Sequence, residues 1–262
     1  MDGEVISCGK AVSEILKSLK TFSPPIKTRI RLILTSLLGK DFSYLQSQRL
    51  KVLENVDIIS FDVFDTLILR PEVSIPSDVF SLIYPQDGYF KARRIEAERV
   101  ARSKALEQGR EDISLCEIYK ALYPTHSDSE LEEAMALEIN TELRVCNVNP
   151  EALALFRSIQ NGKYGKKHVI ITSDMYLSRD VIFTILTSSG FDLEGVDIFI
   201  SSEYGLTKRS GSLFKKVMEL EPIEPKCVLH IGDNLISDYL KPRKCGMRSF
   251  LYSAQNLGVR PH

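Results

Sequence analysis

Carboxylates, hydroxyls and one lysine follow the ends of short apolar runs along this chain of 262 residues. In chain order they are Asp62 and Asp65, then Thr172, Ser173 and Asp174, then Lys208, and finally Asp233 and Asp238. Carboxylates without a histidine or cysteine partner form a hard oxygen site that suits Mg²⁺. A hydroxyl and a lysine can hold phosphate oxygens, and one carboxylate can accept a phosphoryl group as a nucleophile. These residue types therefore predict metal-assisted phosphoryl transfer.

These residues need a scaffold that brings the ends of distant segments together. Short apolar, β-branched runs predict strands at 56–61, 169–172, 198–201, 227–231 and 248–252. Helices are expected between the later strands, at 180–188, 211–220 and 235–245. Such alternation predicts an α/β fold with a Rossmann-like, doubly wound parallel sheet. Ligands of these sheets lie beyond the carboxyl ends of the strands, which is where the polar residues fall.

A helical block interrupts this alternation after the first strand. Residues 75–160 keep helical periodicity without a strand signal, which predicts an insertion that covers the sheet edge. Ser129 and Glu132 have the spacing of a capping box for one of its helices. Residues 1–54 also have helical spacing. The expected domains are an N-terminal helical extension at 1–54, a core at 55–72 and 160–262, and a helical cap at 73–159.

Composition and charge exclude several classes of protein. The formal net charge of −1 argues against a nucleic-acid binder that works by whole-protein charge, though not against a local basic patch. No apolar run approaches the roughly 18–20 residues of a membrane-spanning helix. The N-terminus lacks a basic segment followed by an apolar one, and the five cysteines are scattered, so we expect a cytoplasmic protein. Residues 1–54 carry nine Lys or Arg against five Asp or Glu, a basic arm that can dock on the domain, a partner enzyme or anionic lipid.

The polar residues also carry a family resemblance. The sequence resembles the haloacid dehalogenase-like (HAD) hydrolase superfamily over roughly residues 56–252. Four motifs match in order: SFDVFDTL at 60–67, ITSDMYL at 171–177, LTKRSG at 206–211, and HIGDN at 230–234 with Asp238. The forms FDVFDT, SDMYL and HIGDN are similar to a HAD subgroup associated with bacterial glycosyltransferases and surface polysaccharide synthesis. The insertion resembles a C1-type cap.

The resemblance implies a role for each motif. Asp62 would be the nucleophile, and Lys208 would pair with both the nucleophile and the phosphate. Ser173, or its neighbour Thr172, would bind a phosphoryl oxygen.

The remaining motif residues would hold the metal. Asp233 would ligate Mg²⁺ with support from Asp238, and the backbone carbonyl of Phe64 would be a further ligand. Haloacid dehalogenases do not need Mg²⁺ and usually lack the motif-four acid, so Asp233 and Asp238 favour phosphoryl transfer over carbon–halogen displacement.

The sequence departs from the phosphatase pattern at one position. HAD phosphatases usually place a general acid two residues after the nucleophile, where this chain has Phe64, with Asp65 one residue later. Loss of a positioned acid costs about 10²–10⁴ in rate for a poor leaving group. The substrate could have a good leaving group such as an anomeric hydroxyl, or Asp174 or a cap residue could supply the proton. Alternatively, the domain is a weak or inactive phosphatase. Asp174 could also simply cap the following helix.

Two arginines in the cap are candidates for substrate binding. Arg93 and Arg94 lie in a helix crowded with charge, and a solvated face with i,i+4 pairs is the favoured interpretation. The alternative is that one of them grips a second anion.

Together these patterns predict a Mg²⁺-dependent phosphohydrolase for a small phosphorylated metabolite, most simply a sugar phosphate. An aspartyl phosphate would form on Asp62. The alternative is a non-catalytic module that docks on a glycosyltransferase through residues 1–54.

Overall fold

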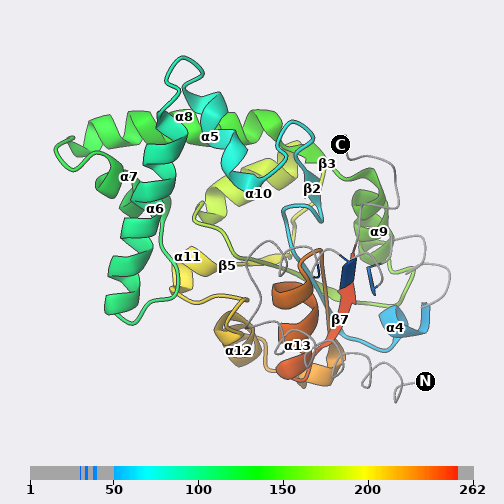
Figure 1. The fold of residues 1–262 in the computed structure, drawn as a ribbon. Helices are drawn as coiled ribbons and strands as arrows, with labels where there is room; N and C mark the ends of the chain where they lie inside the picture. The colour runs from blue at the N-terminus through cyan, green and yellow to red at the C-terminus, as the bar shows by residue number, and fades with distance from the viewer. Residues whose placement is uncertain (1–29, 31–32, 35–37, 40–49, 253–262) are drawn as a thin grey trace.

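The computed structural model describes residues 30, 33–34, 38–39 and 50–252, which Figure 1 draws in colour. Most of the expected extension at 1–54 therefore lies outside the described residues. Within it, Leu34 and Leu38 pack against an apolar cluster made of Leu235, Tyr239, Leu240 and Leu251. Part of the extension thus contacts the core near its last strand.

Five strands form a parallel sheet in the order β5-β4-β1-β6-β7. They are β1 (Ile58–Phe61), β4 (His168–Ser173), β5 (Asp197–Ile200), β6 (Val228–Gly232) and β7 (Arg248–Leu251). Because helices cover both faces of a doubly wound sheet, its strands are continuous apolar runs rather than alternating ones. The predicted α/β fold with a doubly wound parallel sheet is confirmed. β1 lies between β4 and β6, so the residues that follow β1 occupy the centre of the sheet edge.

Alternate residues of β1 face opposite sides of the sheet. Phe61 belongs to a cluster with α9 (Pro150–Gln160) and α10 (Arg179–Ser188), whereas Ile58 packs with α12 (Ser212–Leu220). The remaining core segments are α4 (Leu50–Glu54), α11 (Ser201–Tyr204), the 3₁₀ turn η3 (Pro225–Cys227), the π-helical turn η4 (Leu235–Leu240) and α13 (Lys241–Lys244). The helix expected at 235–245 is therefore divided into η4 and α13.

The helical insertion stands beside the sheet as a separate group (Figure 1). Its elements are η2 (Pro76–Asp78), α5 (Val79–Ile83), α6 (Phe90–Glu107), α7 (Leu115–Leu122) and α8 (Asp128–Val145). The two linkers run side by side, since β2 (Ile68–Leu69) pairs antiparallel with β3 (Asn147–Val148). Helix α9 packs on the sheet, with the Phe156 and Phe61 ring centroids 5.6 Å apart. The cap therefore ends with α8, before the expected boundary at 159.

The N-terminus of α8 differs from the predicted one. Ser127 is the N-cap in extended backbone, and the Glu130 carboxylate accepts hydrogen bonds from the Ser127 backbone N–H and hydroxyl at 2.7 and 2.8 Å. The prediction of a capping box at Ser129 and Glu132 is wrong, because the extended residue lies two positions earlier and Ser129 is already inside the helix.

Arg94 holds the cap together from within. It belongs to the buried stripe of α6 and donates from Nε and Nη2 to the two carboxylate oxygens of Glu138 on α8, each at 2.8 Å. The Tyr119 hydroxyl on α7 donates to the same carboxylate. Arg93 is instead 53% exposed in its side chain and pairs with Asp87.

Among the described residues, every helix is too short or too polar to cross a bilayer.

Neighbouring arginines should therefore differ in their effect on stability. Arg94→Met leaves Glu138 buried without its partner and should lower the free energy of unfolding by about 3–5 kcal/mol. Arg93→Met removes an exposed pair and should cost no more than about 1 kcal/mol. Urea unfolding followed by circular dichroism measures both. Equal losses in the two variants would contradict the assignment of Arg94 to the cap core.

Candidate active site

Lys208 bridges two carboxylates at the centre of the sheet edge. Its Nζ donates to Asp62 Oδ1 at 2.5 Å and to Asp238 Oδ1 at 2.7 Å. All three residues are buried, with Lys208 2% exposed. Burial opposes the charged amine, but Asp238 and Asp62 outweigh that effect and raise the pKa of Lys208. The predicted nucleophile and the predicted lysine therefore lie in direct contact.

The loop that carries Lys208 is held by Asp174. The Asp174 carboxylate accepts hydrogen bonds from the backbone N–H groups of Lys208 and Arg209 at 2.6 and 3.2 Å. It does not cap α10, because Ser178 is the N-cap of that helix. The side chain lines the cavity above Asp62 as well, but its backbone contacts make it primarily an anchor of the lysine loop.

Three carboxylates meet where a cation would be expected. Oxygens of Asp62, Asp233 and Asp238 lie within 4.8 Å of one another. Burial, followed by the charges of Asp62 and Asp238, raises the pKa of Asp233, and burial raises the pKa of Asp62 to about 7. The Asp233 carboxylate has no hydrogen-bond donor among the residues that the structure describes. Both observations indicate an excess of negative charge, and an all-oxygen ligand set fits Mg²⁺.

Asp238 is the most constrained of these carboxylates. Beside Lys208, it accepts a hydrogen bond from the Asn234 backbone N–H at 2.9 Å and contacts His230 Nε2 at 3.1 Å. Both oxygens are therefore engaged. The predicted supporting role of Asp238 agrees with these contacts better than direct ligation, which leaves Asp62 and Asp233 as the candidate metal ligands. Phe64, whose carbonyl was expected to be a further ligand, lies in the wall of the same cavity.

A buried polar relay supports Asp238 from below. His230 Nδ1 lies 2.8 Å from Ser60 Oγ, which lies 3.0 Å from Thr172 Oγ1. Burial lowers the pKa of His230, which favours the neutral ring. Since the Asp238 carboxylate only accepts, His230 Nε2 must donate to it, and Nδ1 must then accept from Ser60. The polar role of His230 follows from the pairing of β1 with β6, which places it beside Ser60.

The relay also decides between the two hydroxyls predicted to bind phosphate. Thr172 is completely buried and directs its hydroxyl toward Ser60, whereas Ser173 lines the cavity. Ser173 is therefore the hydroxyl available to a ligand.

Asp65 reaches the cavity through an unusual backbone conformation. With φ at 57°, it is the one residue other than glycine with positive φ among those described. Aspartate tolerates this left-handed region better than most residues. The Val63 carbonyl accepts from the backbone N–H groups of Leu67 and Ile68 at 2.8 and 2.9 Å and closes the turn around it. Asp65 and Phe64 both line the cavity. Asp65 therefore faces the site even though it lies one position later than the acid of the phosphatase pattern.

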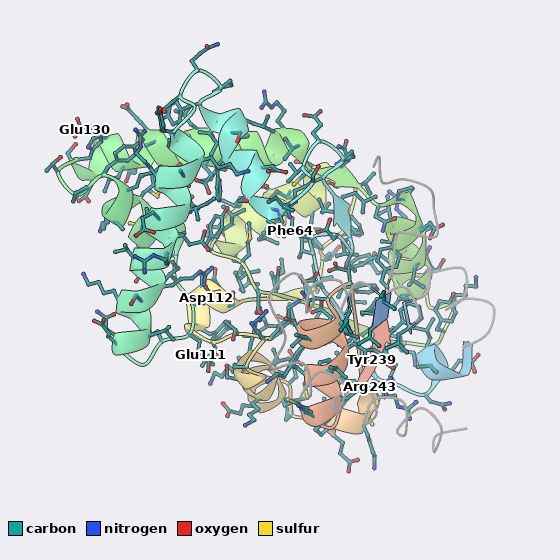
Figure 2. The ribbon with its side chains drawn as sticks, viewed as in Figure 1. Phe64, Glu111, Asp112, Glu130, Tyr239 and Arg243 are labelled. Atoms are coloured by element: carbon teal, nitrogen blue, oxygen red, sulfur yellow. The ribbon has the colours of Figure 1, made fainter. Side chains whose placement is uncertain are left out.

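The cavity has a volume of about 740 Å³ and lies between the sheet edge and the cap. One face of α6 contributes Ile95, Glu98, Arg99 and Arg102 to its wall. The predicted Arg93 and Arg94 do not line it, because Arg93 points to solvent and Arg94 lies in the buried stripe. Arg70 also lines the cavity, with its guanidinium 4.5 Å from the centre of the Phe64 ring (labelled in Figure 2). The sequence prediction missed all three cavity arginines.

Comparisons with known proteins agree with this geometry. The structure resembles that of the HAD-hydrolase YfnB from Bacillus subtilis bound to magnesium, with a TM-score of 0.54 and 18% identity over 79% of this chain and 92% of that one. A 2-haloacid dehalogenase from Pseudomonas syringae pv. Tomato DC3000 gives a TM-score of 0.53 with 15% identity, covering 76% of this chain and 87% of that one. This chain has the HAD-like fold. 

One further solved structure and one relative in sequence are also similar to this chain. The L-2-haloacid dehalogenase of Xanthobacter autotrophicus gives a TM-score of 0.51 with 17% identity, covering 78% of this chain and 81% of that one. In sequence, 59 residues are 39% identical to the human haloacid dehalogenase-like hydrolase domain-containing protein 3, which is 22% of this chain and 24% of that protein. The chain thus matches about a quarter of this relative's length. No protein-family model matches the chain.

Gly232 gives a direct test of how tightly Asp238 is held. A Cβ at Gly232 would lie 2.5 Å from Asp238 Cγ, so Gly232→Ala must displace that carboxylate. We expect Gly232→Ala to lower the free energy of unfolding by about 1–3 kcal/mol through overpacking. Gly88→Ala is the matched control, because no atom lies within 4 Å of its Cβ position, and it should change stability by less than about 0.5 kcal/mol. Equal stability of both variants in urea unfolding would refute the close approach.

Proposed function

We propose that this chain is a Mg²⁺-dependent phosphohydrolase that transfers the phosphoryl group of a small phosphomonoester to Asp62. The observation that carries the proposal is the buried contact of Lys208 with Asp62 and Asp238 beside a third carboxylate, Asp233. This arrangement combines a nucleophile, a fixed positive charge and an oxygen site for a divalent cation. Transfer of a phosphoryl group to an aspartate uses all three.

The first step forms the covalent intermediate. A carboxylate oxygen of Asp62 attacks phosphorus, the bond to the leaving oxygen breaks, and that oxygen takes up a proton. Lys208 balances charge on the nucleophile and the phosphoryl oxygens, and the Ser173 hydroxyl donates to one of those oxygens. Mg²⁺ held by Asp62 and Asp233 would neutralise further charge on the transferred group. In the second step water attacks phosphorus, inorganic phosphate leaves, and the Asp62 carboxylate is regenerated.

Asp65 is the candidate acid and base in both steps. It lines the cavity together with Asp62, and its left-handed backbone turns it toward the site. It would protonate the leaving oxygen in the first step and accept a proton from water in the second. A cavity of about 740 Å³ accommodates a metabolite of the size of a sugar phosphate, with Arg99 and Arg102 as donors to its distal oxygens.

Phe64 favours a second candidate function. It occupies the position expected for the acid and places an apolar ring there, under Arg70. This supports the alternative that the domain is a weak or inactive phosphatase that docks on a glycosyltransferase. The two candidates differ in whether purified protein turns over a phosphomonoester.

Replacement of the nucleophile tests the proposed reaction. Wild type should hydrolyse p-nitrophenyl phosphate with Mg²⁺ and lose that activity in EDTA, and Asp62→Asn should lower kcat by about 10³-fold or more. Asp180→Asn, an exposed aspartate in the first turn of α10, is the matched control and should retain wild-type activity. Unchanged turnover by Asp62→Asn would refute the mechanism. Metal-independent chloride release from 2-chloropropionate would favour a dehalogenase.

The role of Asp65 predicts a dependence on the leaving group. Asn tolerates the left-handed backbone, so Asp65→Asn should keep the turn while removing the proton. Its kcat/KM should fall by about 10²–10⁴ for an alkyl phosphate such as a hexose 6-phosphate, whose leaving group needs a proton. The fall should be much smaller for p-nitrophenyl phosphate. Equal losses for both substrates would show that Asp65 acts only through the turn.

A further inference from the structure

A short connection between two cap helices contacts loops of the core that border the candidate site. Residues 108–114 join α6 to α7, and two of them, Glu111 and Asp112, donate to or accept from groups of the core. The Glu111 backbone N–H donates to the Gly205 carbonyl at 2.8 Å. In Figure 2 the labelled Glu111 and Asp112 lie where the cap helices meet the segment between β5 and α12.

Glu111 Oε2 accepts four hydrogen bonds, all from the loop that carries Lys208. The Thr207 backbone N–H and hydroxyl donate at 2.9 and 3.1 Å, the Ser210 hydroxyl donates at 2.6 Å, and the Ser212 hydroxyl also donates. These donors flank Lys208 on both sides. Burial would raise the pKa of Glu111, but the hydroxyls of Ser210 and Ser212 outweigh it and lower the pKa, so the acceptor is a carboxylate.

Asp112 connects the same part of the cap to the loop after β4. It accepts from the Ser201 hydroxyl, whose oxygen in turn accepts from the Met175 backbone N–H at 2.8 Å. Asp112 also pairs with Arg102, one of the arginines in the cavity wall. Adjacent residues of the cap therefore contact the loop that carries Lys208 and, through Ser201, the loop after β4.

We propose that Glu111 is a positioning residue through which the cap holds Lys208 against Asp62. The Lys208 backbone N–H is held from the core by Asp174, and residues on both sides of Lys208 are held from the cap by Glu111. If Glu111 is replaced, only Asp174 still holds this segment, and the loop from Thr207 to Ser212 loses the oxygen that accepts four of its hydrogen bonds. The cap then contributes to catalysis by ordering the lysine, in addition to enclosing the substrate. The kinetic part of this inference rests on the proposed phosphohydrolase reaction.

Hydrogen–deuterium exchange tests the anchor without any assumption about the reaction. Glu111→Gln should accelerate exchange in peptides covering 205–213 relative to wild type. Glu130→Gln is the matched control, because that glutamate also accepts from a serine hydroxyl and a backbone N–H, but only within the cap and at its far end (Figure 2). Unchanged exchange at 205–213 in Glu111→Gln would overturn the proposal.

Kinetics then separate positioning of Lys208 from a general loss of stability. Glu111→Gln should lower kcat for p-nitrophenyl phosphate by about 10–100-fold, as expected for a misplaced catalytic group, with a smaller change in KM. In a Lys208→Met background the same substitution should have no further effect on kcat, because the group it positions is gone. Additive losses, or a normal kcat despite faster exchange, would overturn the positioning role. Absence of activity in wild type would refute the proposed function, and the exchange result alone would then decide the anchor.

Discussion

The structure depends on one buried ammonium group held between two carboxylates. Lys208 is 2% exposed, and a charge so deeply buried is stable only when partners compensate for its lost hydration. Its partners come from separate segments, since Asp62 follows β1 and Asp238 lies in η4 after β6. The ion bridge therefore fastens two adjacent strand ends to the loop beyond β5. Any displacement of these elements leaves a buried charge uncompensated, which couples the integrity of the site to that of the sheet.

The rest of the sheet edge is built to keep these charges in place. Ser60 and His230 are direct partners in the register of β1 and β6, and that pairing lets the ring support Asp238 from inside the sheet. Gly232 gives the same carboxylate room by lacking a Cβ. Hydroxyls and an imidazole inside an otherwise apolar sheet are costly unless each is satisfied. Here each group donates to the next: Thr172 to Ser60, Ser60 to His230, and His230 to Asp238.

The α/β fold and the place of the candidate site could be predicted from the sequence, because parallel strands bring their carboxyl ends to one edge whatever their loops contain. That rule brings Asp62, Lys208 and the two hydroxyls of Thr172 and Ser173 to this edge, and the choice of Ser173 over Thr172 comes from the structure. Which face of a helix is buried is harder to predict when charged residues lie on all of its faces. Arg94 shares its stripe with alanines, which are too small to mark a buried face, so sequence periodicity does not separate it from the cavity-facing Arg99. Contacts made by Glu111 and Asp174 join distant segments and have no local signal.

The charge balance of the site distinguishes the chemistries that this fold supports. Displacement of halide by a carboxylate needs one nucleophile and no cation, so further acids beside it would only add unfavourable charge. This chain instead gathers Asp62, Asp233 and Asp238 around the single ammonium of Lys208. Burial, followed by the charges of the neighbouring carboxylates, raises the pKa of Asp62 and Asp233, and the acids outnumber the one amine, which leaves an excess of negative charge. A divalent cation carries the charge that removes this excess. In the proposed phosphohydrolase reaction, that cation would also offset the charge of a phosphate dianion, so substrate and cation would each favour binding of the other.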